Sequence, residues 1–110
     1  MTAHLFAGLR VSDFTAARPW YERIFGEPSF FPNDIEAVWT LGDGRQVYIV
    51  EHPEAGHSVV TIMVDDLDER LAKIDLEPAA SETYDNGVRK VTFRDPDGNE
   101  VAFGAVPAGG

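Results

Sequence analysis

Two short segments of the chain alternate between apolar and mixed positions, the period typical of β-strands that bury one face. In residues 5–11 the odd positions hold Leu, Ala, Leu and Val, whereas the even positions hold Phe, Gly and Arg. Residues 58–64 repeat the pattern, with Val, Ile and Val at positions 60, 62 and 64. Alternation of the same kind near the end of each half predicts further strands with one apolar and one mixed face.

Helical periodicity follows the first of these strands. Phe14, Ala17 and Tyr21 recur at spacings of three and four residues, as on one face of a helix. Asp13 stands where an N-cap residue is favoured, and Gly26 stands where a helix commonly ends. A helix is therefore expected between these two residues.

A shorter helix is expected after the second strand. Leu67, Leu71 and Ile74 mark its apolar face. Asp65 or Asp66 precedes that face in the place of an N-cap residue. A strand followed by a helix therefore opens each half of the chain.

The two halves also resemble each other in sequence. Residues 9–14 (LRVSDF) match residues 62–67 (IMVDDL) at an offset of 53. Residues 43–49 (DGRQVYI) match residues 97–103 (DGNEVAF) at an offset of 54. Two separate matches at nearly one offset indicate two tandem modules built on a single plan.

A single α+β domain is therefore expected, with a first module at 1–54 and a second at 55–110. Each module is predicted to follow the order βαβββ, with Asp-Gly turns before its last strand. The strands are expected at 5–11, 29–31, 37–41 and 46–51 in the first module, and at 58–64, 80–84, 89–94 and 100–105 in the second.

The mixed faces of these strands are the candidate site. Small residues on them leave space and polar residues offer directional bonds, so curved mixed sheets would form a cleft around these faces. The alternative is that the mixed face packs against another sheet or subunit. The candidate ligand-binding residues are Phe6, Gln46, Tyr48, Val59, Thr61, Met63, Glu100 and Ala102, with Arg10 at the edge of the cleft.

Composition narrows the functions further. The chain has 110 residues, is 44% hydrophobic and contains no cysteine, which excludes a disordered chain, thiolate nucleophiles and Cys-ligated metals. No apolar run reaches the ~20 residues of a membrane span. The first residues lack the basic and apolar regions of a signal peptide, so we expect a cytoplasmic protein.

The formal net charge of −10 makes a nucleic acid an unsuitable partner, because phosphate binding needs clustered Lys and Arg. The charge serves solubility in the simplest interpretation. The alternative interpretation is that it attracts a cationic small molecule.

Four segments carry a resemblance to a known family. They are residues 9–14 (LRVSDF), 20–26 (WYERIFG), 61–67 (TIMVDDL) and 93–103 (FRDPDGNEVAF). With them the chain resembles the vicinal oxygen chelate superfamily, which includes glyoxalase I, bleomycin-resistance proteins and extradiol dioxygenases. The resemblance implies paired βαβββ modules whose sheets curl around a small-molecule cleft, but it implies no single reaction.

Metal-dependent members of this superfamily place His, Gln or Glu ligands on the first and last strand of each module. The resemblance carries those four positions to Phe6, Tyr48, Val59 and Ala102. Phenyl, isopropyl and methyl groups do not coordinate divalent metals. The chain therefore departs from the enzymatic pattern of glyoxalases and dioxygenases, and no metal cofactor is expected.

Three functions follow as hypotheses. The first is a metal-free, homodimeric binding protein for a planar or partly cationic small molecule, as the resemblance to bleomycin-resistance proteins implies. The second is a metal-dependent lyase, isomerase or dioxygenase that uses a shifted set of ligands two residues away, namely His4, Gln46, His57 and Glu100. The third is a metal-free enzyme in which Tyr48, Glu100 or Arg10 transfers protons.

Overall fold

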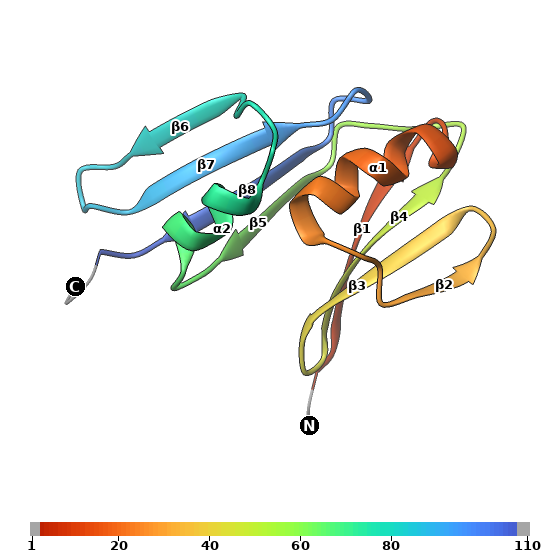
Figure 1. Ribbon diagram of the computed structural model, residues 1–110, viewed down its shortest axis with the longest axis horizontal. Helices are drawn as coiled ribbons and strands as arrows, with labels where there is room; N and C mark the ends of the chain where they lie inside the picture. The colour runs from red at the N-terminus through yellow and green to blue at the C-terminus, as the bar shows by residue number, and fades with distance from the viewer. Residues whose placement is uncertain (1–2, 108–110) are drawn as a thin grey trace.

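A computed structural model describes residues 3–107 as two βαβββ modules, which confirms the α+β class expected from the sequence (Figure 1). The first module contains β1 (Leu5–Val11), α1 (Phe14–Phe25), β2 (Phe30–Asn33), β3 (Glu36–Gly42) and β4 (Arg45–Glu51). The second contains β5 (Val59–Met63), α2 (Leu67–Lys73), β6 (Ala80–Thr83), β7 (Arg89–Arg94) and β8 (Glu100–Ala105). Neither helix has the length and apolar character needed to cross a membrane.

Each module forms its own mixed sheet of four strands. The first sheet has the order β1-β4-β3-β2 and the second has the order β5-β8-β7-β6. The first and last strands of each module pair in parallel, which places Gly8 opposite Tyr48 and Thr61 opposite Ala102. Gly8 and Thr61 are 53 positions apart, and Tyr48 and Ala102 are 54 positions apart. Residues that match between the two halves of the sequence therefore occupy matching places in the strand pairing of the two modules.

Local sequence sets the ends of α1 as expected. The Asp13 carboxylate accepts a hydrogen bond from the Ala16 amide at 3.2 Å, and Gly26 follows the helix with a φ of 82°. The shorter α2 differs, because the Asp66 carboxylate binds the Arg70 guanidinium at 2.8 Å and caps no amide. Ile74 lies just beyond that helix instead of on its last turn.

Strand ends differ from expectation by at most two residues. Strand β5 begins at Val59, because the Ser58 amide donates to the Asn99 side chain at 3.0 Å instead of joining the ladder as a strand residue. Strand β2 begins and ends later than the sequence pattern predicts, at Phe30–Asn33. These differences leave the alternation of the two faces unchanged.

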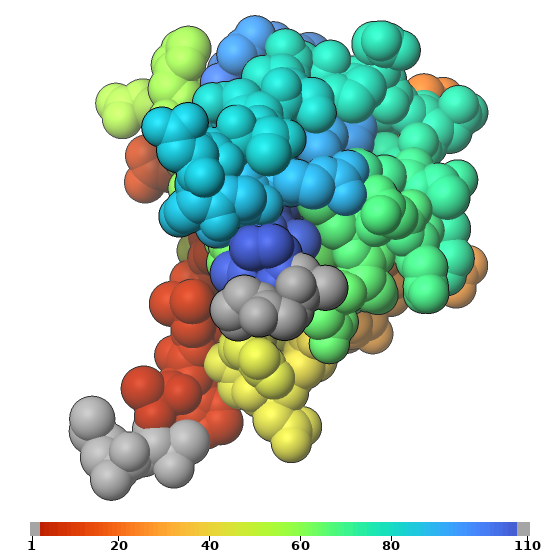
Figure 2. Space-filling view, turned by 90° about the vertical axis from the view of Figure 1, so that its left-hand side faces the viewer, coloured from red at the N-terminus to blue at the C-terminus, as the bar shows by residue number. Residues whose placement is uncertain are grey.

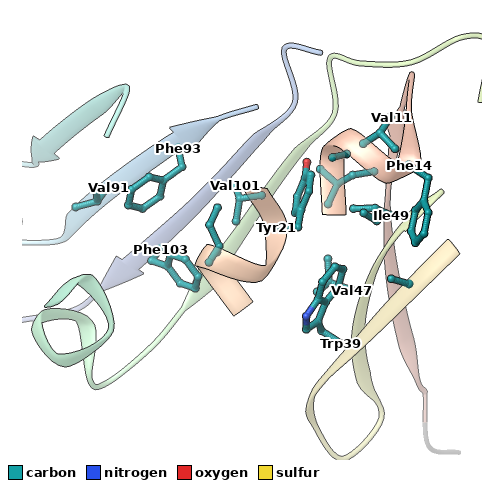
Figure 3. Close-up of a cluster of buried hydrophobic side chains, with 14 of the residues drawn as sticks. Val11, Phe14, Tyr21, Trp39, Val47, Ile49, Val91, Phe93, Val101 and Phe103 are labelled. Atoms are coloured by element: carbon teal, nitrogen blue, oxygen red, sulfur yellow. The ribbon is translucent and has the colours of Figure 1, made fainter. Parts of the chain in front are cut away.

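The apolar faces of both sheets share one core with the helices. Figure 3 shows Tyr21 of α1 between Val101 and Phe103 of the second module and Ile49 of the first. The Phe25 and Phe103 rings lie 6.1 Å apart across the modules. Both helices lie on one side of the two sheets, so the other side of each sheet, here called its open face, has no helix over it (Figure 1).

A buried polar network joins the modules at one end. The Tyr21 hydroxyl donates to the Asp95 carboxylate at 2.7 Å. The Asn99 side-chain amide donates to the same oxygen at 2.9 Å and to the Arg10 carbonyl at 2.7 Å. The backbone amides of Asp97 and Asn99 donate to the second carboxylate oxygen at 2.9 and 2.8 Å. The turn before β8 is thereby bonded to both α1 and β1.

Burial and the neighbouring Asp95 carboxylate raise the pKa of Tyr21 far above its ordinary value of about 10. Desolvation is the larger cause, and the hydrogen bond and negative charge of Asp95 add to it. Tyr21 therefore stays protonated in the folded protein when exposed tyrosines ionise.

We expect Tyr21→Phe to lower the free energy of unfolding by about 1.5–3 kcal/mol at pH 7, because a buried carboxylate loses a donor. The raised pKa stabilises the fold fully below pH ~10 and loses its effect as the pH rises further. Above pH ~10 the gap between wild type and variant should shrink by up to about 1.4 kcal/mol per pH unit.

Urea unfolding across this pH range measures both effects. Tyr84→Phe is the matched control, because Tyr84 is 42% exposed and its hydroxyl takes part in no side-chain hydrogen bond within residues 3–107. A gap that is the same at pH 8 and pH 11 would contradict the role assigned to Tyr21.

Candidate functional site

The open faces of the two sheets carry all eight residues predicted to bind a ligand. Phe6, Gln46 and Tyr48 lie on the first sheet. Val59, Thr61, Met63, Glu100 and Ala102 lie on the second. The structure therefore gathers the predicted residues into two groups, one on each sheet.

An aromatic surface covers the centre of the first open face. Phe6 of β1 is 56% exposed although its side chain is fully apolar. The Tyr48 ring lies across Gly8 of the neighbouring strand, where an added Cβ would stand 2.5 Å from the ring. Gly8 is thus the residue that lets Tyr48 lie flat, and the two aromatic side chains offer a surface on which a planar molecule can stack.

The second open face is more polar and less bulky. Val59 and Met63 are 63% and 55% exposed, whereas Ala102 is fully covered. The Met63 thioether lies over Gly104, where an added Cβ would stand 2.7 Å from the sulfur. Val59 and Met63 therefore provide the apolar surface of this face, and Ala102 contributes mainly by being small.

Equivalent positions on the two faces hold equivalent side-chain pairs. The Gln46 amide donates to the Thr40 hydroxyl at 3.1 Å. At the matching positions of the second module, the Arg94 guanidinium donates to one Glu100 oxygen at 2.9 and 3.2 Å. Gln46 and Glu100 are therefore already engaged by a neighbour on the adjoining strand.

The two histidines of the shifted ligand set lie at turns. His4 packs on Gly44 in the β3–β4 turn, and His57 packs on Gly98 in the β7–β8 turn, with ring atoms 2.7 and 2.9 Å from the place of an added Cβ. His57 itself has a positive φ of 63°. Within residues 3–107 no group of three or more His, Asp or Glu side chains is arranged to hold a metal ion.

A groove of about 620 Å³ lies between the modules. It is lined by three predicted ligand-binding residues, Gln46, Thr61 and Met63, together with residues that the sequence pattern assigned to the core. It runs between the edge strands β1 and β5, and Figure 2 shows the red start of β1 and the yellow β3–β4 turn extending below the second module. Arg45 and Asp65 contribute charged groups to it. Its apolar walls include Ala7, Val47, Val60, Ile62, Val64 and Phe103.

The alternation pattern assigned those wall residues to the helix-covered faces, which is correct for each sheet taken alone. The groove arises because the sheets meet at the Asp95 turn and diverge toward the opposite end, with no strand pairing between them in residues 3–107. Near the groove two apolar side chains are 66% exposed, Leu5 at the start of β1 and Val106 just after the end of β8.

Comparison with known proteins gives one strong similarity. The chain is 54% identical to a glyoxalase/bleomycin resistance protein from Catenulispora acidiphila DSM 44928, over 96% of this chain and 100% of that one, with a TM-score of 0.91. The chain matches no protein-family model and no curated protein.

Two more distant structures share the fold. A lactoylglutathione lyase from Agrobacterium tumefaciens is 21% identical, with 96% and 94% of the two chains covered and a TM-score of 0.76. A bleomycin-binding protein, solved in complex with bleomycin, is 21% identical over 96% and 100% of the two chains, with a TM-score of 0.72. Both similarities concern the fold alone.

The contact between Gly8 and Tyr48 can be tested by a double-mutant cycle. We expect Gly8→Ala to destabilise the wild type by about 1 kcal/mol, because the new methyl group displaces the ring. In a Tyr48→Ala background the same change should be neutral or stabilising, since Ala suits a strand better than Gly by roughly 0.5–1 kcal/mol. Equal effects of Gly8→Ala in both backgrounds would show that the ring does not lie on Gly8.

Proposed function

The chain belongs to the glyoxalase/bleomycin resistance (vicinal oxygen chelate) superfamily, and from that membership we propose that it is a metal-free binding protein for a small planar molecule. We place the binding site on the open faces of its sheets and assign the protein to the cytoplasm. A distant relative binds bleomycin, which supports small-molecule binding as a role for this fold.

The observation that carries this proposal is the chemistry at the four superfamily metal positions. Phe6, Tyr48, Val59 and Ala102 offer one phenol and no imidazole, amide or carboxylate group. A divalent cation needs nitrogen or oxygen ligands from several side chains at once. These four residues do not fit a metal, and their aromatic and apolar surfaces suit a planar organic ligand.

The shifted ligand set is a weaker basis for a metal enzyme. His4 and His57 pack on turn glycines, Gln46 is bonded to Thr40, and Glu100 is paired with Arg94. A metal would have to draw each of these four groups away from its present partner. We therefore give the binding function precedence over a lyase or dioxygenase that uses these residues.

We further propose that the protein is a homodimer. The edge strands β1 and β5 pair with no other chain segment on their outer sides within residues 3–107, and they expose Leu5, Phe6, Val59 and Met63. Exposed apolar edges favour association. A two-fold axis that sets β1 of one chain beside β5 of its partner repeats the same contact twice and covers all four edges.

This arrangement places the first sheet of one chain beside the second sheet of its partner. Two equivalent clefts then form, each with the aromatic surface of Phe6 and Tyr48 on one side and the polar surface around Thr61 on the other. The intermodule groove lies between the same two strands, so the dimer also helps to cover its apolar walls.

Metal and ligand binding separate the proposed function from its enzymatic alternatives. We expect no stoichiometric metal in the purified protein and no rise of Tm with Ni²⁺, Zn²⁺, Fe²⁺ or Mn²⁺. Planar aromatic compounds should raise the free energy of unfolding, by about 2.7 kcal/mol at one hundred times Kd. Bound metal that is lost in His4→Ala or Glu100→Ala variants would support the shifted metal site and contradict this proposal.

Light scattering tests the dimer. We expect twice the monomer mass at micromolar concentration, and a monomer for Val59→Glu, because this change buries a carboxylate at the proposed contact. Ile35→Glu is the matched control, since Ile35 is 42% exposed but lies away from strands β1 and β5. A wild-type monomer, or a dimer that Val59→Glu leaves intact, would contradict the proposed contact.

A further inference from the structure

The open faces are electrically balanced although the protein is strongly acidic. By strand alternation they carry Glu36, Glu82 and Glu100 as acids and Arg10, Lys90 and Arg94 as bases. The chain as a whole has nineteen acidic and nine basic residues and a net charge of −10. The excess negative charge therefore lies outside the strand positions of the open faces.

Distant acids have little influence on a ligand at the open faces. At physiological salt, exposed charges more than about 8 Å apart are largely screened from each other. The groups that line the site therefore decide which charge a ligand carries, and the net charge of −10 does not by itself favour a cationic ligand.

The carboxylate of Glu100 is already paired with a guanidinium. Among the described residues, Glu100 is the one acid on the open faces of β1, β4, β5 and β8. One of its oxygens accepts two hydrogen bonds from the Arg94 guanidinium, from Nη2 at 2.9 Å and from Nε at 3.2 Å. A cationic ligand would find no free carboxylate there and would have to compete with Arg94.

Lys90 provides the opposite charge, and the exposed Glu82 lies directly opposite it on β6 without an ion pair between them. Lys90 is half-buried on the open face of β7, beside Gly104, and none of the ion pairs within residues 3–107 involves it. The Met63 side chain over Gly104 gives it an apolar neighbour. An ammonium group that is partly removed from water beside an apolar surface attracts an anionic group more strongly than a fully exposed one does.

We propose that the ligand of the cleft is a small aromatic acid, whose ring stacks on Phe6 and Tyr48 and whose carboxylate pairs with Lys90. This inference rests on the proposed binding function and on the proposed dimer, because Phe6 and Tyr48 lie on the first sheet of one chain and Lys90 lies on the second sheet of the other. It specifies the ligand class of the cleft. Arg10, which is 4.0 Å from the exposed Glu54 carboxylate, provides a second and more weakly paired cation at the edge of the first open face.

Three probes with one ring system test the charge preference: 2-naphthoate, 2-naphthamide and 2-naphthylmethylammonium. Calorimetric titration should give a Kd for naphthoate at least tenfold lower than for the ammonium probe, with the amide between them. Lys90→Met should weaken naphthoate about tenfold, the loss of one charge-assisted contact, and change the amide less than twofold.

Two matched variants control for non-specific effects. Lys73→Met removes an exposed charge from α2 and should leave all three affinities unchanged. Arg45→Met removes one of the cations that line the intermodule groove and should also have no effect. Arg94→Met frees Glu100 and should improve binding of the ammonium probe.

The outcomes separate the ligand class from the binding function. If all three probes bind equally well and Tyr48→Ala weakens them equally, the cleft binds aromatic molecules but the inferred acid preference is wrong. Tighter binding of the ammonium probe, or a loss of naphthoate with Arg45→Met instead of Lys90→Met, overturns the inference as well. If no probe binds at millimolar concentration, both the inference and the proposed function fail.

Discussion

The buried carboxylate of Asp95 is the constraint on which the arrangement of the two modules depends. It is 4% exposed, takes part in none of the ion pairs within residues 3–107, and is held by four donors from Tyr21, Asp97 and Asn99. A buried charge without a cation is stable only when its hydrogen bonds are complete. Since these donors come from both modules, the modules are locked together at this end of the molecule.

That constraint also explains why the other end of the molecule is open. The turn that contains Asp95 and Asn99 is hydrogen-bonded to α1 through Tyr21 and to β1 through the Arg10 carbonyl. It is also bonded to the Ser58 amide just before β5, so it holds these three elements together at one end. From this junction the sheets diverge, which leaves a groove of about 620 Å³ and two apolar edge strands, β1 and β5, whose outer sides pair with no other strand within residues 3–107. In the proposed dimer a second copy of the chain supplies the matching edges, and the proposed binding cleft is a consequence of that pairing.

Much of the fold was predictable because the chain repeats one plan. The offsets of 53 and 54 residues predicted the two βαβββ modules, and strand alternation predicted the placement of the candidate residues on one face of each sheet. The Asp95 network was not predictable, since its partners lie 74 and 4 positions away and no periodicity connects Tyr21 with Asn99. The groove was also missed, because alternation describes each sheet alone and not the angle between two sheets. Whether the eight candidate residues share one cavity stays a prediction.

A mixing experiment tests most directly whether each cleft combines sheets from two chains. Tyr48→Ala damages the first open face, and Thr61→Trp blocks the second, so neither variant alone should bind 2-naphthoate. When equal amounts are unfolded and refolded together, half of the dimers should contain one chain of each kind, and each of these regains one intact cleft. About a quarter of the wild-type binding sites should therefore be recovered. No recovery, with mixed dimers present, would show that the cleft does not form between chains.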